Sequence, residues 1–168
     1  MATFEKAVEI AARRHAGQQD KQGGPYLTHP LRVWARVAED APDDLDAQIV
    51  AVLHDAVEDT DLTFDDLRAE GFSETVINAL RRVTHDPADS YAEYVVGCAG
   101  DPIARRVKLS DLADNTRLSR MLMRPDREAK DLKMLRRYAL AYQFLMEQLS
   151  EADYRRRMAE APPAPPAG

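Results

Sequence analysis

Hydrophobic residues recur every three or four positions along most of the chain, which is the spacing of one face of an α-helix. Such stripes cover residues 3–17, 30–39, 73–83, 89–99 and 102–115, and breaks rich in Gly, Pro, Asp or Ser separate them. We find no convincing strand pattern and no internal repeat. The pattern predicts an all-α fold of about eight helices.

The longest stripe lies near the C-terminal end, and we expect it to pack in the core. It follows Pro125–Asp126, which we take as the start of the last long helix, and consists of Leu132, Leu135, Tyr138, Ala139, Tyr142, Leu145, Met146 and Leu149. The final segment, Ala161–Gly168, is rich in Pro and Ala and predicts a disordered tail. We therefore expect one domain over residues 1–155 and a tail over 156–168.

The segment from Ile49 to Thr60 combines an apolar first half with a polar second half. Four consecutive apolar residues begin it and predict a helix that is buried on most sides. If one helix spans the whole segment, residues four apart are neighbours, so His54 lies over Glu58 and Asp55 over Asp59. The segment holds no Lys or Arg. Since unpaired buried acids are costly, the pattern indicates a bound cation.

Composition changes this picture little. The chain has 168 residues, 45% of them hydrophobic and 31% charged, which fits one soluble globular domain. A net charge of -6 argues against a general nucleic-acid or membrane-surface binder. The single cysteine, Cys98, has apolar neighbours and predicts a buried, inert thiol. No apolar run reaches transmembrane length, so we expect a cytoplasmic protein. Homo-oligomer formation stays open.

Other polar residues gain meaning only in combination. Taken alone, His15 on an apolar face is best explained as a hydrogen-bonded core histidine, and His29 before Pro30 as a helix cap. Lys21 and Tyr26 lie in a Gly- and Pro-rich loop over residues 18–28. Asp111 lies four residues before Asn115 on a predicted helix, where a site role and an ion pair with Lys108 or Arg117 are equally good explanations.

Taken in order, these segments resemble the HD superfamily of metal-dependent phosphohydrolases. More narrowly, the chain is similar to the hydrolase domain of the RelA/SpoT family and to the stand-alone small alarmone hydrolases. The phrases that carry the resemblance are Ala12–Gln18, Gly24–Leu31, Leu53–Thr60 and Lys108–Asp111. It extends from about residue 4 to about residue 150.

The resemblance implies a site and an activity. His29, His54, Asp55 and Asp111 would hold one divalent ion, typically Mn²⁺ in this family, and two imidazoles with two carboxylates suit such a cation. Glu58 and Asp59 would orient or deprotonate the attacking water. The family removes the 3′-pyrophosphate from guanosine tetra- or pentaphosphate, (p)ppGpp. The residues expected to contact this nucleotide are Lys21, Tyr26, Asn115 and Arg117.

Four positions depart from the family pattern. Asp20 replaces a basic residue before Lys21, Leu112 and Asp114 replace basic and aromatic types, and Leu118 stands at an often polar position. Phosphohydrolysis is therefore implied more firmly than the nucleotide. One alternative is an HD-type phosphatase of another nucleotide, such as an NADPH 2′-phosphatase or a nucleotidase. The other is a non-catalytic regulatory module that binds metal and nucleotide, although binding alone does not need Glu58 and Asp59.

Overall fold

The computed structural model describes residues 2–120 and 127–160. Within these ranges the chain is all-α, as predicted, with ten α-helices, one short 3-10 helix and no strand. The elements are α1 (Phe4–Arg14), α2 (Thr28–Asp40), α3 (Leu45–Leu53), α4 (Ala56–Asp59), α5 (Phe64–Ala69), α6 (Glu74–Val83), α7 (Tyr91–Ala99), α8 (Pro102–Asn115), η1 (Leu118–Arg120), α9 (Glu128–Leu145) and α10 (Glu151–Ala159).

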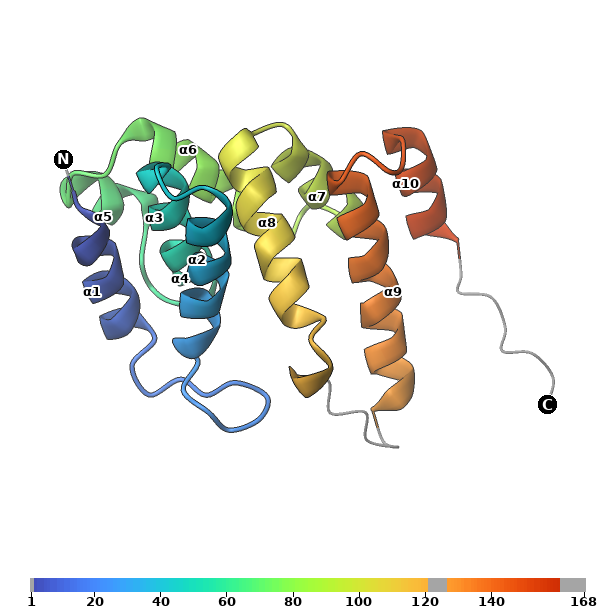
Figure 1. Cartoon of the computed structure of the whole chain (residues 1–168), viewed down its shortest axis with the longest axis horizontal. Coiled ribbons are helices and arrows are strands. Elements are labelled where there is room, and N and C mark those ends of the chain that lie inside the picture. The colour runs from blue at the N-terminus through green and yellow to red at the C-terminus, as the bar shows by residue number, and fades with distance from the viewer. Residues whose placement is uncertain (1, 121–126, 161–168) are drawn as a thin grey trace.

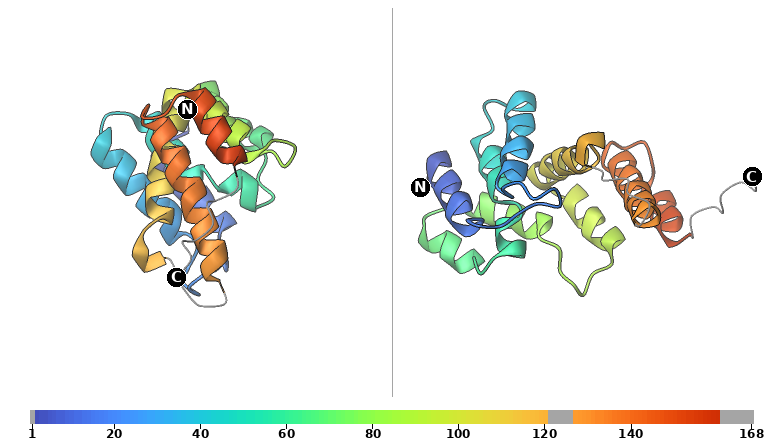
Figure 2. Two further views of the ribbon diagram at one scale, coloured as in Figure 1. Left: turned by 90° about the vertical axis from the view of Figure 1, so that its right-hand side faces the viewer. Right: turned by 90° about the horizontal axis from the view of Figure 1, so that it is seen from below.

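Helix α8 occupies the middle of the molecule (Figure 1). It packs against α2, α3 and α6 on one side and against α7 and α9 on the other. The two views in Figure 2 show that α9 and α10 lie together at the end away from α1. As a result, α8 can bring side chains toward both halves of the fold.

Helix α3 forms the centre of the hydrophobic core. All seven residues from Ala47 to Leu53 are buried, so the apolar run is a helix covered on every side, as predicted. Helices α1, α2, α6 and α8 surround it. A helix covered in this way has little freedom to shift, and the residues that follow Leu53 therefore start from a fixed point.

Several helices begin directly after a side chain that caps them. Thr63 and Asp66 form a reciprocal capping box at α5, and Asp44 and Ser73 accept backbone N–H groups at the starts of α3 and α6. His29 differs from expectation, because α2 already begins at Thr28. His29 thus lies in the first turn of the helix and not at its cap, and Pro30 is tolerated there because first-turn amides lack helical partners.

The expected continuous helix over Ile49–Thr60 is wrong. Helix α3 ends at Leu53, and the short helix α4 begins only at Ala56. Nδ1 of His54 donates to the carbonyl of Ala51 at 2.8 Å, the acceptor that a continuous helix would use for the amide of Asp55. This contact ends the helix and turns His54 and Asp55 together toward α2.

The prediction for the last long helix is also partly wrong. In α9 the buried residues are Asp131, Leu140, Ala141 and Leu145, whereas Leu132, Tyr142 and Met146 are exposed. The helix is apolar on more than one side, so its sequence does not reveal which side meets the core. The predicted start at Pro125–Asp126 lies outside the described residues.

Helix α10 was not expected, because its stretch of charged residues shows only a weak apolar face. Tyr154 anchors it, fully buried and stacked on Phe144 with ring centroids 4.7 Å apart. The predicted boundary of a domain over residues 1–155 and a tail over 156–168 falls inside this helix, because α10 continues to Ala159. Residues 161–168 lie outside the described residues. Among the helices that the structure describes, none is both long and apolar enough to cross a membrane.

Candidate metal centre

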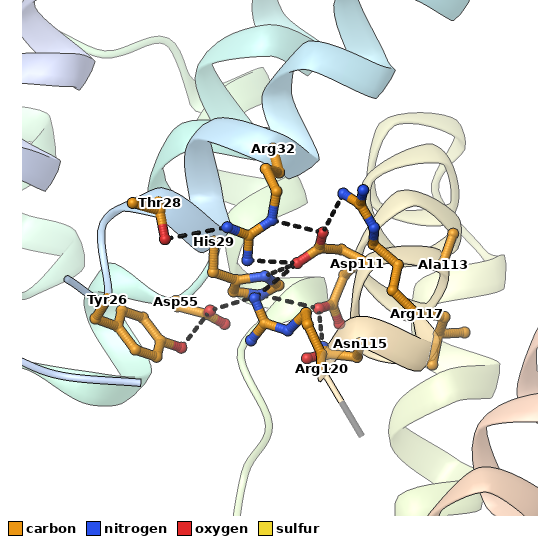
Figure 3. A network of polar contacts seen from close by, with 12 residues as sticks. Tyr26, Thr28, His29, Arg32, Asp55, Asp111, Ala113, Asn115, Arg117 and Arg120 are labelled. Carbon is orange, nitrogen blue, oxygen red and sulfur yellow. Dashed lines mark hydrogen bonds and ion pairs between the residues drawn. The ribbon is translucent and has the colours of Figure 1, made fainter. Parts of the chain in front are cut away.

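The four predicted metal ligands come together from three separate segments. Figure 3 shows three of them, His29, Asp55 and Asp111. Nε2 of His29, on α2, lies 3.4 Å from Oδ2 of Asp55 and 3.2 Å from Oδ1 of Asp111, on α8. Nε2 of His54 lies 3.1 Å from the same Asp55 oxygen and 3.9 Å from the same Asp111 oxygen. The donor atoms of His29, His54 and Asp55 all lie within 4.8 Å of one another, and Asp111 approaches this group through the two histidines.

The protonation of His54 indicates what belongs among these donor atoms. Because Nδ1 of His54 donates to Ala51, its Nε2 carries a lone pair in the neutral ring. This Nε2 is buried and makes no hydrogen bond, although Asp55 is close. Burial lowers the pKa of His54, but Asp55 and Asp111 outweigh it and raise that pKa, so a positive charge, either a proton or a metal ion, is favoured at this nitrogen. The donor set therefore fits a divalent metal ion of the borderline kind.

Electrostatics at the site point the same way. Burial alone would lower the pKa of His29, but the carboxylates of Asp111, Asp114 and Asp55 outweigh it and raise that pKa to about 10. Burial would likewise raise the pKa of Asp111, but Lys108 and the two histidines hold it well below its usual range. The carboxylates therefore stay ionised and create a negative potential that favours a cation.

Asp114 is a site residue that sequence reasoning missed and treated only as a departure from the family pattern. It is 1% exposed, and its Oδ2 accepts a hydrogen bond from Nδ1 of His29 at 2.7 Å. Arg32 donates to both of its oxygens, at 2.8 and 3.0 Å, and Arg120 donates to Oδ2 at 2.9 Å. A carboxylate in this position fixes which nitrogen of His29 is protonated and leaves Nε2 available as a ligand.

Two of the predicted nucleotide contacts touch the metal ligands instead. The hydroxyl of Tyr26 donates to Oδ2 of Asp55 at 2.6 Å, and burial together with that carboxylate raises the pKa of the phenol. The amide of Asn115 donates to Oδ1 of Asp111. Both side chains therefore orient metal ligands, whether or not they also meet a substrate.

A cavity of about 410 Å³ opens next to this cluster. Its lining includes His29, Asp55 and Asp111 together with Lys21, Tyr26, Glu58, Asp59 and Asn115. Glu58 and Asp59 are the exposed residues of α4, and Oε2 of Glu58 accepts the backbone N–H of His85 at 2.9 Å. Their catalytic role stays a prediction.

Arg117 does not line that cavity. Its side chain is 56% exposed and lies 3.5 Å from Oδ1 of Asp114. Arg120, one turn further along, lines the cavity instead and was not singled out from the sequence. The sequence shows the basic residues of this region but not which of them faces the cavity.

Asp20 has a local structural role. Its Oδ1 accepts the backbone N–H groups of Gln22 and Gly24, at 2.9 and 3.0 Å, and so closes the turn of the loop. The acid that replaces a basic residue therefore organises the loop that carries Lys21. His15 behaves as predicted, buried and with Nδ1 2.8 Å from Oε1 of Gln18.

The helical fold and the cluster of two histidines and two aspartates define a helical domain with a cation site of nitrogen and oxygen ligands. The HD domain family matches residues 7–143. The chain therefore belongs to the HD domain family, as the resemblance implied.

Three relatives place it more closely. A GTP pyrophosphokinase of Streptomyces coelicolor is 36% identical over 145 residues, which are 81% of this chain and 17% of that protein. The guanosine-3′,5′-bis(diphosphate) 3′-pyrophosphohydrolase MESH1 of Danio rerio is 35% identical over 69% of this chain and 68% of its own. The guanosine-3′,5′-bis(diphosphate) 3′-pyrophosphohydrolase of Aquifex aeolicus is 36% identical over 68% of this chain and 17% of its own. The chain thus spans a small part of the long relatives and about two thirds of MESH1.

A solved structure supports the same relationship. It is described as a metazoan ortholog of SpoT that hydrolyzes ppGpp and plays a role in starvation responses. Its TM-score to this chain is 0.62 at 26% identity, over 88% of this chain and 96% of its own.

Proposed function

We propose that this HD domain is a metal-dependent pyrophosphohydrolase that converts guanosine 3′,5′-bis(diphosphate) into GDP and pyrophosphate. The observation that carries the proposal is the convergence of His29, His54, Asp55 and Asp111 beside a cavity that also holds basic side chains. The activities named for the relatives from Aquifex aeolicus and Danio rerio support the choice of substrate.

The four side chains would hold one divalent ion, and we expect Mn²⁺. When bound, such an ion lowers the pKa of a water ligand and neutralises phosphate charge. Asp114, Tyr26 and Asn115 would keep the ligands in place through the hydrogen bonds described above. The buried Lys108, 2.8 Å from Oδ2 of Asp111, would keep that carboxylate ionised.

The reaction adds one water across a P–O bond. The water oxygen forms a bond to the phosphorus that is attached to the 3′ oxygen, and the bond between that phosphorus and the 3′ oxygen breaks. The 3′ oxygen takes up a proton and becomes a hydroxyl as pyrophosphate leaves. Glu58 and Asp59 are exposed carboxylates on the cavity wall and suit the removal of the proton from water. Lys21 and Arg120 line the same wall and would bind phosphate oxygens.

The test uses the purified chain with Mn²⁺ and guanosine 3′,5′-bis(diphosphate), with GDP and pyrophosphate measured separately. Asp55→Ala should abolish both metal binding and turnover. Asp65→Asn is the matched control, because Asp65 is an exposed helix-start acid paired with Arg68 and should not affect either readout. Full activity of D55A would refute the site.

A nucleotide panel tests the substrate. NADPH and nucleoside monophosphates should release no phosphate at rates comparable to pyrophosphate release from the guanosine compound. Phosphate release from NADPH alone would replace our substrate assignment with a 2′-phosphatase, and binding without turnover of any nucleotide would indicate a regulatory module.

A further inference from the structure

Arg137 of α9 lines the same cavity as the metal cluster, and it has no acidic partner in the described part of the chain. Its guanidinium carbon lies 4.3 Å from the ring centroid of Tyr91 and 5.4 Å from that of Tyr138. Its Nε is buried and makes no hydrogen bond. Among residues 2–120 and 127–160, no carboxylate lies within ion-pair distance of Arg137. In the described part of the chain, the guanidinium of Arg137 therefore has two aromatic contacts and no ion pair.

The other cations of the cavity divide into two groups. Lys108 is paired with Asp111 at 2.8 Å, and Arg120 with Asp114 at 2.9 Å. Lys21 is like Arg137 in forming no ion pair with a carboxylate in the described part of the chain. Its Nζ lies 3.9 Å from Sδ of Met134. Two of the four Lys and Arg side chains that line this cavity thus lack an acid.

These two cations line the same cavity, and Lys21 reaches the helix that carries Arg137. Met134, which Lys21 touches, is three residues before Arg137 on the same helix, so the two side chains of α9 are neighbours. The loop before α2 and the helix α9 therefore present their free charges to the same region of the cavity.

Arg137 is half-buried, and its Nε is buried without a hydrogen bond in the described part of the chain. Burying part of a charged group without a partner is costly, and an anion in the cavity would offset that cost. The aromatic rings contact Arg137 by its face, which holds it in place by a cation–π interaction. Its N–H donors point from the edge of the planar group and match the paired oxygens of a phosphate. The hydroxyl of Tyr91 is also buried and has no hydrogen-bond partner in the described part of the chain. It offers a second donor, because the guanidinium of Arg137 lies against the same ring.

We propose that Arg137, held against the rings of Tyr91 and Tyr138, is an anion-binding residue of this site that works with Lys21. The two bind a phosphate group of the nucleotide other than the one that is cleaved, which for the proposed substrate is the 5′-diphosphate. The identity of the nucleotide rests on the proposed function, but the anion site itself does not.

The decisive experiment compares Arg137→Gln with Arg136→Gln. Arg136 is the adjacent residue, loses the same charge, and donates to the carbonyl of Arg157 in the groove between α9 and α10, outside the cavity. The dissociation constant of GDP is measured by calorimetry for each Mn²⁺-loaded protein. R137Q should weaken GDP binding by about 10- to 100-fold, the range for a lost charge-assisted hydrogen bond. R136Q should change it less than about twofold, as surface charges do.

Equal affinities for R137Q and R136Q would overturn the proposal. If R137Q does not fold, as judged by circular dichroism, Arg137→Lys decides. It keeps the charge but loses the planar fork, so GDP affinity should fall at least threefold, and unchanged affinity of R137K would overturn the proposal.

Kinetics separate this proposal from the proposed function. With an active enzyme, R137Q should raise KM for guanosine 3′,5′-bis(diphosphate) while kcat changes less than KM. An unchanged KM would refute the role of Arg137 and leave the activity intact. Weaker GDP binding by R137Q in a protein that does not turn over this substrate would refute the activity and leave the anion site intact.

Discussion

Replacing Asp114 should reveal how strongly a neighbour of a metal ligand controls metal binding. Asp114→Asn keeps an oxygen that can accept the Nδ1–H of His29 but removes the negative charge. Asp114→Ala removes the acceptor altogether. The two variants therefore separate the geometric and the electrostatic parts of the contact.

The expected size follows from the contact itself. A hydrogen bond to a charged group contributes about 1.5–3 kcal/mol and a neutral one about 0.5–1.5 kcal/mol. D114N should therefore lose about 1–1.5 kcal/mol of metal affinity, roughly a tenfold weaker Kd. D114A should weaken it by roughly 10- to 100-fold, the range observed when the partner of a metal-ligating histidine is removed.

D114A should also destabilise the fold, because it leaves Arg32 and Arg120 without their buried acid. Breaking a fully buried pair costs about 3–5 kcal/mol. The side chains of Arg32 and Arg120 are 33% and 17% exposed, so water compensates part of this loss and the cost should be smaller. D114N should lose less still, since its amide oxygen can accept from one arginine.

Manganese binding is measured by calorimetry or by the loss of the free-ion electron paramagnetic resonance signal. Asp61→Asn is the control, since it removes the same charge from an exposed pair with Arg14 outside the site. An Mn²⁺ affinity of D114A equal to that of D61N, in folded protein, would refute the claim that Asp114 positions His29.

Three further outcomes follow from the structure. Saturating Mn²⁺ at about 100 times its Kd should add about 2.7 kcal/mol of stability, so a chelator should lower Tm by roughly 5–10 °C in a thermal melt; an unchanged Tm would argue against a site that joins three segments. Burial raises the pKa of the Cys98 thiol to about 11, so iodoacetamide at pH 8 should label native protein far more slowly than unfolded protein. The contribution of Cys98 to the free energy of unfolding should decline as pH rises above 9 toward 11, because only the unfolded thiol then ionises. Rapid labelling of the native protein would contradict the burial of this thiol. Leu80→Ala empties a fully buried position of α6 and should cost about 2–5 kcal/mol in urea unfolding, whereas a loss below 1 kcal/mol would mean that the site repacks.

The clustering of His29, His54, Asp55 and Asp111 could be predicted because these residues lie in short sequence motifs whose order along the chain is specific. Each is a polar residue with apolar neighbours in the sequence, so a few residues around it are enough to single it out. The all-α fold and the capping residues Asp44, Thr63 and Ser73 could be predicted for a similar reason, since helical periodicity and capping are local signals.

The features that could not be predicted depend on contacts between distant residues. Asp114 and His29 are 85 positions apart, and nothing near either residue indicates the pair. That Arg137 forms no ion pair in the described part of the chain likewise becomes visible only from its three-dimensional surroundings. In α9 apolar residues occur around much of the helix, so periodicity alone could not show that Ala141 is buried while Tyr142 is exposed.

The corner between α3 and α4 ties the chemistry to the interior of the molecule. In a regular helix, adjacent side chains diverge by about 100°, so His54 and Asp55 could not both face His29. Between α3 and α4 both side chains do face His29. The residue before them, Leu53, is the last residue of α3, the helix at the centre of the core. Changes in surface loops should therefore leave the spacing of this pair intact, whereas repacking Val52 or Leu53 by a single methyl group should displace a ligand directly.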